Sequence, residues 1–279
     1  MPETEAIVLL NDKELPSGQL EDLQPFKGID LYEVIRVVKG MPIFTEDHLE
    51  RLAHSFQLAG ADTPENFETI QERINRLIRI NRVSEGNIRI DAYLSEGHSD
   101  LLLQFVPHYY PHEEEYSKGV KLIFFRAERE NPNAKIMRTE MKDSIAAKLK
   151  ETGAYEALLV NSSGRITEGS KSNLFAIRGQ ALFTPPASEV LQGITMKHVV
   201  EICRQHSLTC FEQSLFIADL PMFDALFITG TSPKLLPACC LEQYSFDPSN
   251  NLLRSLMGWY DERIAQYLHT ASGKTSGNY

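Results

Sequence analysis

Strand-like and helix-like segments follow one another along this chain without a regular strand–helix–strand alternation. Runs rich in Val, Ile and Leu, such as 31–38 and 87–94, alternate irregularly with stretches whose apolar residues recur at helical spacing. A doubly wound parallel sheet needs a helix between successive strands. The order therefore predicts a mixed α/β fold of the α+β type and not a single doubly wound sheet.

A polar segment near the middle divides the chain. At 279 residues the chain exceeds a typical single domain, so two domains are expected. The segment HYYPHEEEYSKG, residues 108–119, contains a proline and a run of glutamates and is the candidate linker. We expect a smaller N-terminal α/β domain over 1–107 and a larger C-terminal domain over 120–279.

Charge and cysteine usage exclude several classes of protein. A net charge of -10 argues against a nucleic-acid-binding surface. The apolar run near the N-terminus is too short for a signal peptide or a membrane span. The four cysteines have neither a disulfide framework nor metal-ligand spacing. We expect a soluble, cytoplasmic protein with reduced thiols, no bound metal, and no nucleic-acid or membrane partner.

The segment GRITEGSKSNLF, residues 164–175, holds one carboxylate, Glu168. This glutamate lies between β-favouring Ile166 and Thr167 on one side and a Gly-Ser turn on the other. One interpretation is a solvated residue at the edge of a sheet. The other is a carboxylate that faces a bound group needing a negative charge.

Residues 191–197, LQGITMK, place a glycine before the start of an amphipathic helix. Backbone amides at a helix start and the positive end of its dipole suit a phosphate, with the Thr195 hydroxyl as a further donor. The simpler alternative is that Thr195 only caps the helix. In TGTSP, residues 229–233, Pro233 suits a first helical position, and again either a cap or an anion site is open.

Two basic residues, Arg51 and Lys135, are candidates for a role in binding or catalysis. Arg51 lies three residues after His48 on one face of a predicted helix, beside an apolar stripe. It could form a surface ion pair, or its planar fork could bind a phosphate. Lys135, in NAKIM, follows an Asn-Pro-Asn turn, whereas Lys142 falls on the next helix. A reactive lysine needs partial desolvation, for which Lys135 is the better placed of the two.

The order of these segments resembles the fold-type IV pyridoxal-phosphate enzymes. The chain shows LYEVIRVVKGMPIFTEDHLERL, a lysine, GAYEALLVNSSGRITEGSKSNLF, LFTPPASEVLQGIT and FITGTSPKLLP in that order. That family includes branched-chain and D-amino acid aminotransferases and aminodeoxychorismate lyases. The resemblance extends from about Gly28 to about Pro237, and it implies a small N-terminal α/β sandwich and a larger C-terminal cofactor-binding domain.

The resemblance implies pyridoxal phosphate as the cofactor and assigns its contacts. Lys135 matches the Schiff-base lysine that also moves the substrate proton, with Lys142 as the second candidate. Glu168 matches the glutamate that pairs with the pyridine nitrogen. The residues implied for the phosphate are Arg51, Ile194, Thr195, Thr231 and Ser232.

Three further positions match the family more loosely. Leu191 matches an apolar residue that packs on the cofactor ring, and Tyr32 an aromatic residue on the substrate side. Asn173 matches a motif position to which we assign only the orientation of the Glu168 turn.

The chain also departs from the family pattern. Met196 and Lys197 follow Thr195 where arginine is frequent, and Glu140 stands where branched-chain enzymes carry a tyrosine, with Arg138 nearby. The stretch AYLSEGHSD contains His98 but no arginine to hold a substrate carboxylate. These departures bear on the substrate more than on the cofactor.

The resemblance implies an aminotransferase that moves an amino group between an amino acid and a 2-keto acid. The alternatives are a lyase similar to aminodeoxychorismate lyase, or a protein that binds pyridoxal phosphate without turnover. A homodimer is also implied. Neither the substrate nor its stereochemistry follows from these motifs.

Overall fold

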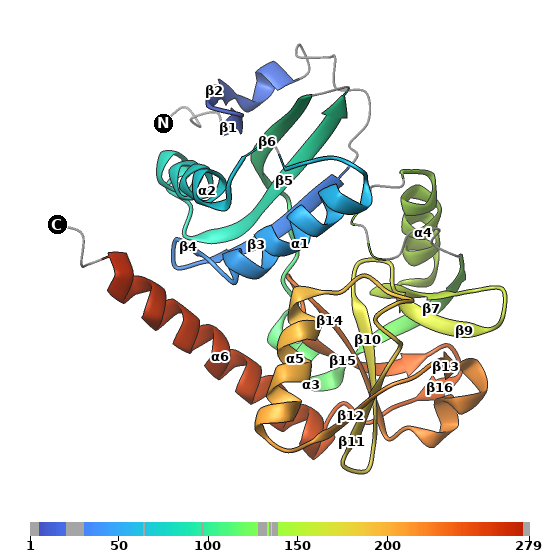
Figure 1. Ribbon diagram of the computed structural model, residues 1–279. Coiled ribbons are helices and arrows are strands. Elements are labelled where there is room, and N and C mark those ends of the chain that lie inside the picture. Colours follow the sequence, from blue (N-terminus) through green and yellow to red (C-terminus); the bar gives the residue numbers. More distant parts are fainter. Residues whose placement is uncertain are drawn as a thin grey trace. The chain divides into compact units, whose positions relative to one another are not determined.

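The computed structural model describes residues 6–20, 31–63, 65–95, 98–127, 133, 135 and 139–275. The chain forms two compact units (Figure 1). The N-terminal unit takes in Met1–Tyr109, Ala134–Met137 and Ala265–Tyr279, and the C-terminal unit takes in Tyr110–Asn133 and Arg138–Ile264.

The N-terminal unit is built on a six-stranded antiparallel sheet. The strands are β1 (Ile7–Leu10), β2 (Lys13–Pro16), β3 (Leu31–Val38), β4 (Met41–Pro42), β5 (Glu85–Ser95) and β6 (His98–Val106). They lie in the order β2-β1-β6-β5-β3-β4, and a 3-10 turn, η1 (Ser17–Leu20), follows β2. Lys39 and Gly40, both at positive φ, form the tight turn of the expected β3–β4 hairpin.

Two helices cover one face of this sheet, α1 (Thr45–Leu58) and α2 (Phe67–Asn81). Their apolar residues pack against the alternate residues of β3, β5 and β6 that point to the same side. Asn66 caps α2 by accepting the Thr69 amide, 2.8 Å away. By residue type Thr45 suits the cap of α1, but this prediction is wrong, because Thr45 is the first helical residue and Phe44, which precedes it, makes no side-chain cap bond.

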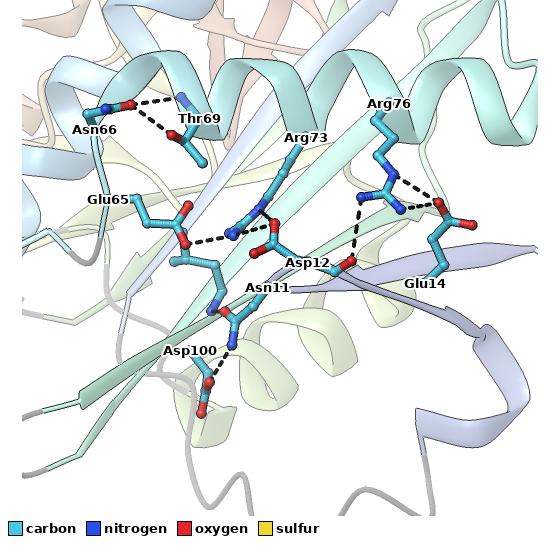
Figure 2. A network of polar contacts seen from close by, with 10 residues as sticks. Asn11, Asp12, Glu14, Glu65, Asn66, Thr69, Arg73, Arg76 and Asp100 are labelled. Atoms are coloured by element: carbon cyan, nitrogen blue, oxygen red, sulfur yellow. Dashed lines mark hydrogen bonds and ion pairs between the residues drawn. The ribbon is translucent and has the colours of Figure 1, made fainter.

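A polar cluster joins the β1–β2 turn to α2 (Figure 2). The Nε and Nη2 atoms of Arg73 donate to Asp12 Oδ1 over 3.1 and 2.9 Å, and Nη2 also pairs with Glu65 at 2.7 Å. Arg76 pairs with Glu14 on β2. These contacts tie the edge hairpin of the sheet to the helix that covers it.

The C-terminal unit is built on a ten-stranded mixed sheet. Its strands are β7 (Val120–Arg126), β8 (Glu156–Val160), β9 (Arg165–Gly169), β10 (Asn173–Arg178), β11 (Ala181–Thr184), β12 (Thr209–Glu212), β13 (Leu215–Phe216), β14 (Ala225–Gly230), β15 (Lys234–Leu241) and β16 (Tyr244–Ser245). The order is β12-β11-β10-β14-β15-β7-β8-β9-β13, and β16 pairs with β15. The order confirms the prediction of mixed α/β structure without double winding.

The β-rich runs over 156–184, with turns at Ser163-Gly164 and Arg178-Gly179, predict a meander of strands; the strands and both turns are confirmed, but the pairing of successive strands is wrong at β9 and β10. Strands β9 and β10 follow each other in sequence but lie in different parts of the sheet, where β9 pairs with β8 and β13 while β10 pairs with β11 and β14. The turn between them therefore joins two strands that contact each other without pairing, and Glu168 lies at the end of β9 directly before this turn.

Helices α3 (Glu113–Lys118), α4 (Thr139–Thr152) and α5 (Ile194–Gln205), the 3-10 segment η2 (Ile217–Met222) and helix α6 (Asn251–Thr275) complete the described elements. Helix α3 lies within the segment expected as a linker. The small and polar residues of ASGKTSGNY, residues 271–279, predict a helix end near Thr270, but helix α6 continues to Thr275. No helix within the described residues is both long and apolar enough to cross a membrane.

Helix α5 contacts β14, and its N-cap Gly193 lies against the side chain of Asn173, which is on the same side of the sheet as Phe175 and Phe227. The two phenylalanine rings are stacked with centroids 5.2 Å apart. Asn173 and Thr229 lie two residues along from these rings on their strands and face each other in the β10–β14 register. Because side chains alternate across a strand, Asn173 and Thr229 lie on the α5 side of the sheet.

Candidate active site

Glu168 is a buried carboxylate and not a solvated edge residue. It is the fourth residue of β9, is 3% exposed, and its Oε2 accepts the backbone amide of Leu191 over 3.2 Å. Burial of a carboxylate is costly unless hydrogen bonds or an opposite charge compensate it. The interpretation of Glu168 as a solvated edge residue is therefore wrong.

The turn that follows Glu168 is tightly closed. The Gly169 amide donates to the Ser172 carbonyl over 2.7 Å, and a Cβ on Gly169 would lie 2.0 Å from Ser172 Oγ. A larger residue at this position would displace the Ser172 hydroxyl and crowd the Ser172 carbonyl, 3.2 Å away. The glycine of the motif is required here by close approach, since its φ is not positive.

A second buried glutamate supports this turn, and the sequence interpretation missed it. Glu156, the first residue of β8, accepts from the Ser170 hydroxyl and from the Lys171 amide. Burial raises the pKa of the Glu156 carboxyl, more than its hydrogen bonds and the charge of Lys171 lower it. The fully apolar neighbours of Glu156 in EALLV were the signal that this position is buried.

The loop before α5 is held by side chains at several points. Asn173 Nδ2 donates to the Leu191 carbonyl over 2.7 Å, while Glu168 accepts the amide of the same residue. The Asn133 amide, in the orientation that satisfies its surroundings, donates to the carbonyls of Ala187 and Val190 over 3.0 and 2.9 Å. Leu191 is consequently fixed through both its amide and its carbonyl.

Helix α5 begins at Ile194 after Gly193, which is the N-cap residue. A glycine has no side chain to accept hydrogen bonds from the first helical amides, and these amides carry the positive end of the helix dipole. Thr195 lies inside the helix, so the alternative that it serves as the cap is wrong. Its hydroxyl is buried and accepts from the Tyr260 hydroxyl over 3.3 Å.

Thr231 and Ser232 lie in the turn of an antiparallel hairpin. Strands β14 and β15 pair up to Gly230 and Lys234, which leaves only the turn between them. The expected helix start at Pro233 is therefore wrong, because strand pairing takes up the residues on both sides. The two hydroxyl residues are on a turn at the end of β14, the strand that contacts α5.

Lys135 is grouped with Tyr32 in the N-terminal unit. The Tyr32 amide donates to the Lys135 carbonyl over 3.1 Å, and Lys135 Nζ lies 4.8 Å from the centroid of the Tyr32 ring. An ammonium at this distance from an aromatic face is attracted by the ring quadrupole. Lys142, the second candidate lysine, is exposed on α4.

Arg89 approaches the same tyrosine and was missed in the sequence, where an arginine was sought over residues 92–100 and not earlier in β5. Its Cζ lies 4.8 Å from the Tyr32 centroid, and its Nε pairs with Asp91 at 2.5 Å. Burial raises the pKa of Asp91 despite this pair. The alternation of Ile88, Arg89 and Ile90 was the available signal that Arg89 faces away from the helices.

The Arg51 side chain is only 9% exposed and forms an ion pair with Glu33 instead of lying on the surface. Its Nε and Nη2 donate to the two oxygens of Glu33 over 2.7 and 2.8 Å, and His48 Nδ1 lies 2.8 Å from Glu33 Oε2. Glu33 is completely buried on β3. Sequence reasoning missed Glu33, although it shares the core side of β3 with Leu31 and Ile35.

The surroundings of Glu33 and His48 determine the charge that each carries. Burial raises the pKa of Glu33, but the Arg51 charge and the hydrogen bonds from His48 and Arg51 outweigh it and hold that pKa far below its usual range. Burial lowers the pKa of His48, which is raised in turn by Glu33 but ends below its ordinary value. Since an ionised carboxylate only accepts, the neutral His48 ring carries its hydrogen on Nδ1.

The structure thus groups the expected residues into two sets, one in each unit. Tyr32, Arg51 and Lys135 belong to the N-terminal unit, and Glu168, Leu191, Ile194, Thr195, Thr231 and Ser232 belong to the C-terminal unit. Arg138 lies outside the described residues, as do the side chains of His98 and Glu140. Within the described part of the chain, no group of three His, Cys, Asp or Glu residues could hold a metal ion.

Comparison with known proteins identifies a single family. The sequence model described as "Amino-transferase class IV" matches residues 30–240. Among curated relatives, the D-alanine aminotransferase of Bacillus licheniformis is 25% identical over 77% of this chain and 80% of its own length. The aminodeoxychorismate lyase of Bacillus subtilis (strain 168) is 22% identical over 88% of this chain and 89% of its own length.

Solved structures share the fold. The branched-chain amino acid aminotransferase of Escherichia coli superposes with a TM-score of 0.82 at 19% identity, over 93% of this chain and 95% of that one. A T.th. branched-chain amino acid aminotransferase with pyridoxamine 5'-phosphate superposes with a TM-score of 0.79 at 23% identity, over 93% of this chain and 94% of that one. These similarities confirm the expected fold-type IV architecture.

Proposed function

Because the chain belongs to the class IV aminotransferase family, we propose that it is a pyridoxal-phosphate-dependent aminotransferase acting on an amino acid and a 2-keto acid. The proposal is supported by relatives of this family and by the neighbouring structure that contains pyridoxamine 5'-phosphate. It assigns the substrate only to a chemical class.

One observation carries the proposal. The buried Glu168 carboxylate and the glycine-capped start of α5 are linked through a single residue, Leu191, which precedes that start by three positions. A ligand with a basic ring nitrogen at one end and a phosphate at the other needs a carboxylate and an anion-binding helix start held in fixed relation. Pyridoxal phosphate has this distribution of charge.

The donor set fits the phosphate end of this cofactor. The amides of Ile194 and Thr195 lie at the positive end of α5, and the hydroxyls of Thr195, Thr231 and Ser232 are the proposed additional donors. Thr229 Oγ1 is buried with no hydrogen-bond partner among the described residues, directly across from Asn173 in the register. A buried hydroxyl in this condition favours a polar ligand nearby.

The remaining residues have the following proposed roles. Arg51, held by Glu33, supplies a fixed positive charge to the phosphate. Leu191 packs against the ring, and Tyr32 lines the substrate side. Lys135 attaches the cofactor through its amine.

When bound, pyridoxal phosphate supplies an electron sink for the carbon that loses its proton. Once the substrate amine has displaced the Lys135 amine from the cofactor, Lys135 would act as base and then as acid, because its free amine can accept the proton from the substrate Cα and deliver it to C4′ of the cofactor. Glu168 holds the ring nitrogen protonated by providing a buried negative charge beside it.

A lyase remains the second candidate, since the Bacillus subtilis relative is named as one. Both reactions need Lys135 and Glu168 in the same roles. A panel of amino donors without a keto acid separates them, because transamination leaves the cofactor in the amine form while a lyase returns it unchanged. A protein that binds the cofactor without turnover would give no product with any donor.

The first experiment is an absorbance spectrum of the purified protein before and after borohydride reduction, followed by peptide mapping. We expect a pyridoxyl label on Lys135. A label on Lys142, or no label, would contradict the assignment of the lysine.

Replacement of Glu168 tests the charge beside the ring. Glu168→Ala should leave folding intact and lower turnover strongly, by on the order of a hundredfold or more, as expected for loss of a charge that stabilises the transition state. Circular dichroism checks the fold, and steady-state kinetics measures turnover. Unchanged turnover would remove the role of Glu168.

We also propose that the protein is a homodimer, as the family resemblance implies. Light scattering or sedimentation measures the mass in solution. A monomer at working concentrations would contradict this part of the proposal without touching the cofactor assignment.

A further inference from the structure

We propose that Asn173 is a positioning residue that holds Glu168 and the start of α5 in fixed relation to one another. This inference rests on the proposed function, in which Glu168 faces the cofactor ring and α5 faces its phosphate. It goes beyond the orientation of the Glu168 turn, because the contacts of Asn173 are made with the loop before α5.

The first contact is a buried hydrogen bond. Asn173 is the first residue of β10, is 5% exposed, and donates from Nδ2 to the Leu191 carbonyl over 2.7 Å. Glu168 accepts the Leu191 amide, so both polar groups of one loop residue are bound by side chains from β9 and β10. If the Asn173 bond is lost, the loop can rotate away from Glu168.

The second contact is steric and involves Gly193, the N-cap of α5. A Cβ built on Gly193 would lie 2.0 Å from Asn173 Oδ1. The φ of Gly193 is -67°, which any residue adopts, so the glycine is required by this close approach and not by its backbone conformation. The Asn173 amide group therefore touches the loop at Leu191 and the helix start at Gly193.

The two contacts together explain why an asparagine suits this position. Its nitrogen must donate to a carbonyl while its oxygen lies against the glycine, and the amide provides both functions in one planar group. An aspartate has nearly the same shape but only accepts when ionised. This difference makes the donated hydrogen bond separately testable.

The test measures the dissociation constant for pyridoxal phosphate, and the absorption spectrum of the bound cofactor, for wild type, Asn173→Ala and Asn173→Asp. Asn173→Ala should bind on the order of tenfold or more weakly at every pH, as expected for loss of a buried hydrogen bond. Its bound cofactor should also show a displaced absorption band, because Glu168 is no longer held beside the ring.

Asn173→Asp separates the hydrogen bond from the volume of the side chain. At pH 8 the carboxylate of the aspartate variant is ionised and faces the Leu191 carbonyl without a hydrogen to donate. This variant should therefore bind the cofactor as poorly as the alanine variant does. Burial raises the pKa of such a carboxyl, so protonation toward pH 5.5 restores a donor and should bring affinity back toward wild type. At each pH the dissociation constant of the variant is divided by that of wild type. This ratio cancels the titration of Glu168 and of other groups that both proteins share.

Two results would overturn the inference. Wild-type affinity in Asn173→Ala would show that the contact is unnecessary, and repulsion of the phosphate by a new charge would then explain any defect in the aspartate variant. If the ratio of the dissociation constants of Asn173→Asp and wild type does not change with pH, the hydrogen bond donated by Asn173 is not what holds the site. Thr184→Val is the matched control, since it removes a buried hydroxyl bond to the adjacent Leu174 carbonyl and leaves the contacts of Asn173 with Leu191 and Gly193 in place.

Failure of the proposed function is distinguishable from failure of this inference. If wild type binds no pyridoxal phosphate, the cofactor assignment is wrong. Hydrogen exchange at the Leu191 amide in the cofactor-free protein still tests Asn173, because Asn173→Ala should exchange faster there than wild type. Equal exchange in the two proteins would contradict the positioning role by itself.

Discussion

Glu33 in the N-terminal unit and Glu156 in the C-terminal unit are both buried glutamates, yet their pKa values move in opposite directions. Both carboxyls lose their hydration, which alone raises the pKa of each. Glu33 lies against the Arg51 guanidinium and accepts three hydrogen bonds, whereas Glu156 accepts from neutral groups. The difference shows that contact with a full positive charge, and not burial, decides whether the pKa of a buried glutamate is raised or lowered.

The comparison also separates two kinds of support for the proposed site. The Glu33–Arg51 pair fixes a charge that is proposed to bind a phosphate. Glu156 instead holds a backbone turn, whose position determines where Glu168 points. An ion pair is thus used to orient a side chain, and a set of neutral hydrogen bonds to orient the main chain.

The largest effect is expected for Glu33→Gln. This change leaves the Arg51 charge buried without its partner, and breaking a buried ion pair in this way costs about 3–5 kcal/mol. Hydrogen exchange in β3 and α1 measures the loss within the N-terminal unit, since two units need not unfold together. Unchanged exchange would show that Arg51 finds another partner.

The same pair predicts how stability depends on pH. Because the folded pKa of Glu33 lies below the unfolded value, its contribution is fully present above about pH 4.3 and is lost as the pH falls below that value. The advantage of wild type over Glu33→Gln should shrink by up to about 1.4 kcal/mol per pH unit there. Hydrogen exchange or denaturant unfolding at several pH values checks the slope.

Glu156→Gln should have a smaller effect with the opposite dependence on pH. The folded pKa of Glu156 is raised, so wild type loses stability as the pH rises from about 4.3 through that folded value. Over this pH range the free energy of unfolding of the glutamine variant should rise relative to that of wild type. Below this range the difference between the two proteins should stay constant. A variant that loses relative to wild type at high pH would show that the ionised carboxylate is stabilising.

The smallest effect is expected at the surface part of the cluster in Figure 2. Arg76 and Glu14 are each about two-fifths exposed, so Arg76→Ala should cost no more than about 1 kcal/mol, less at high salt. Urea unfolding at low and high ionic strength measures both values. A larger loss would mean that Arg76 holds the β1–β2 hairpin as firmly as the buried Arg73 does.

Several features of the fold could be predicted because they depend on local pattern. The β3–β4 hairpin follows from Lys39-Gly40 between two β-rich runs, and the α5 stripe of Met196, Val199 and Cys203 follows from helical spacing. The hairpin at Gly230–Lys234 was misread, because Pro233 suits a helix start equally well until β15 is known to pair with β14.

Some residues of the candidate site could likewise be found from the sequence, and others only from the structure. Glu168 and the glycine before α5 stood out in the sequence because their order matched a family. Glu33, Glu156 and Arg89 did not, since a charged residue in an alternating strand could face either solvent or a partner. Period-two spacing placed Glu33 on the core side of β3, but only the position of α1 shows that Arg51 is there to meet it.

The sequence by itself determined the family, the mixed α/β class and the identity of the residues proposed to bind the cofactor. These follow from residue type and order, which do not require knowledge of distant contacts. The tertiary structure decided which of those residues are buried and what holds them. Asn173 meets Leu191 and Gly193 because β10 begins after a three-residue turn beside β9 without pairing to it, and no spacing along the sequence records that arrangement.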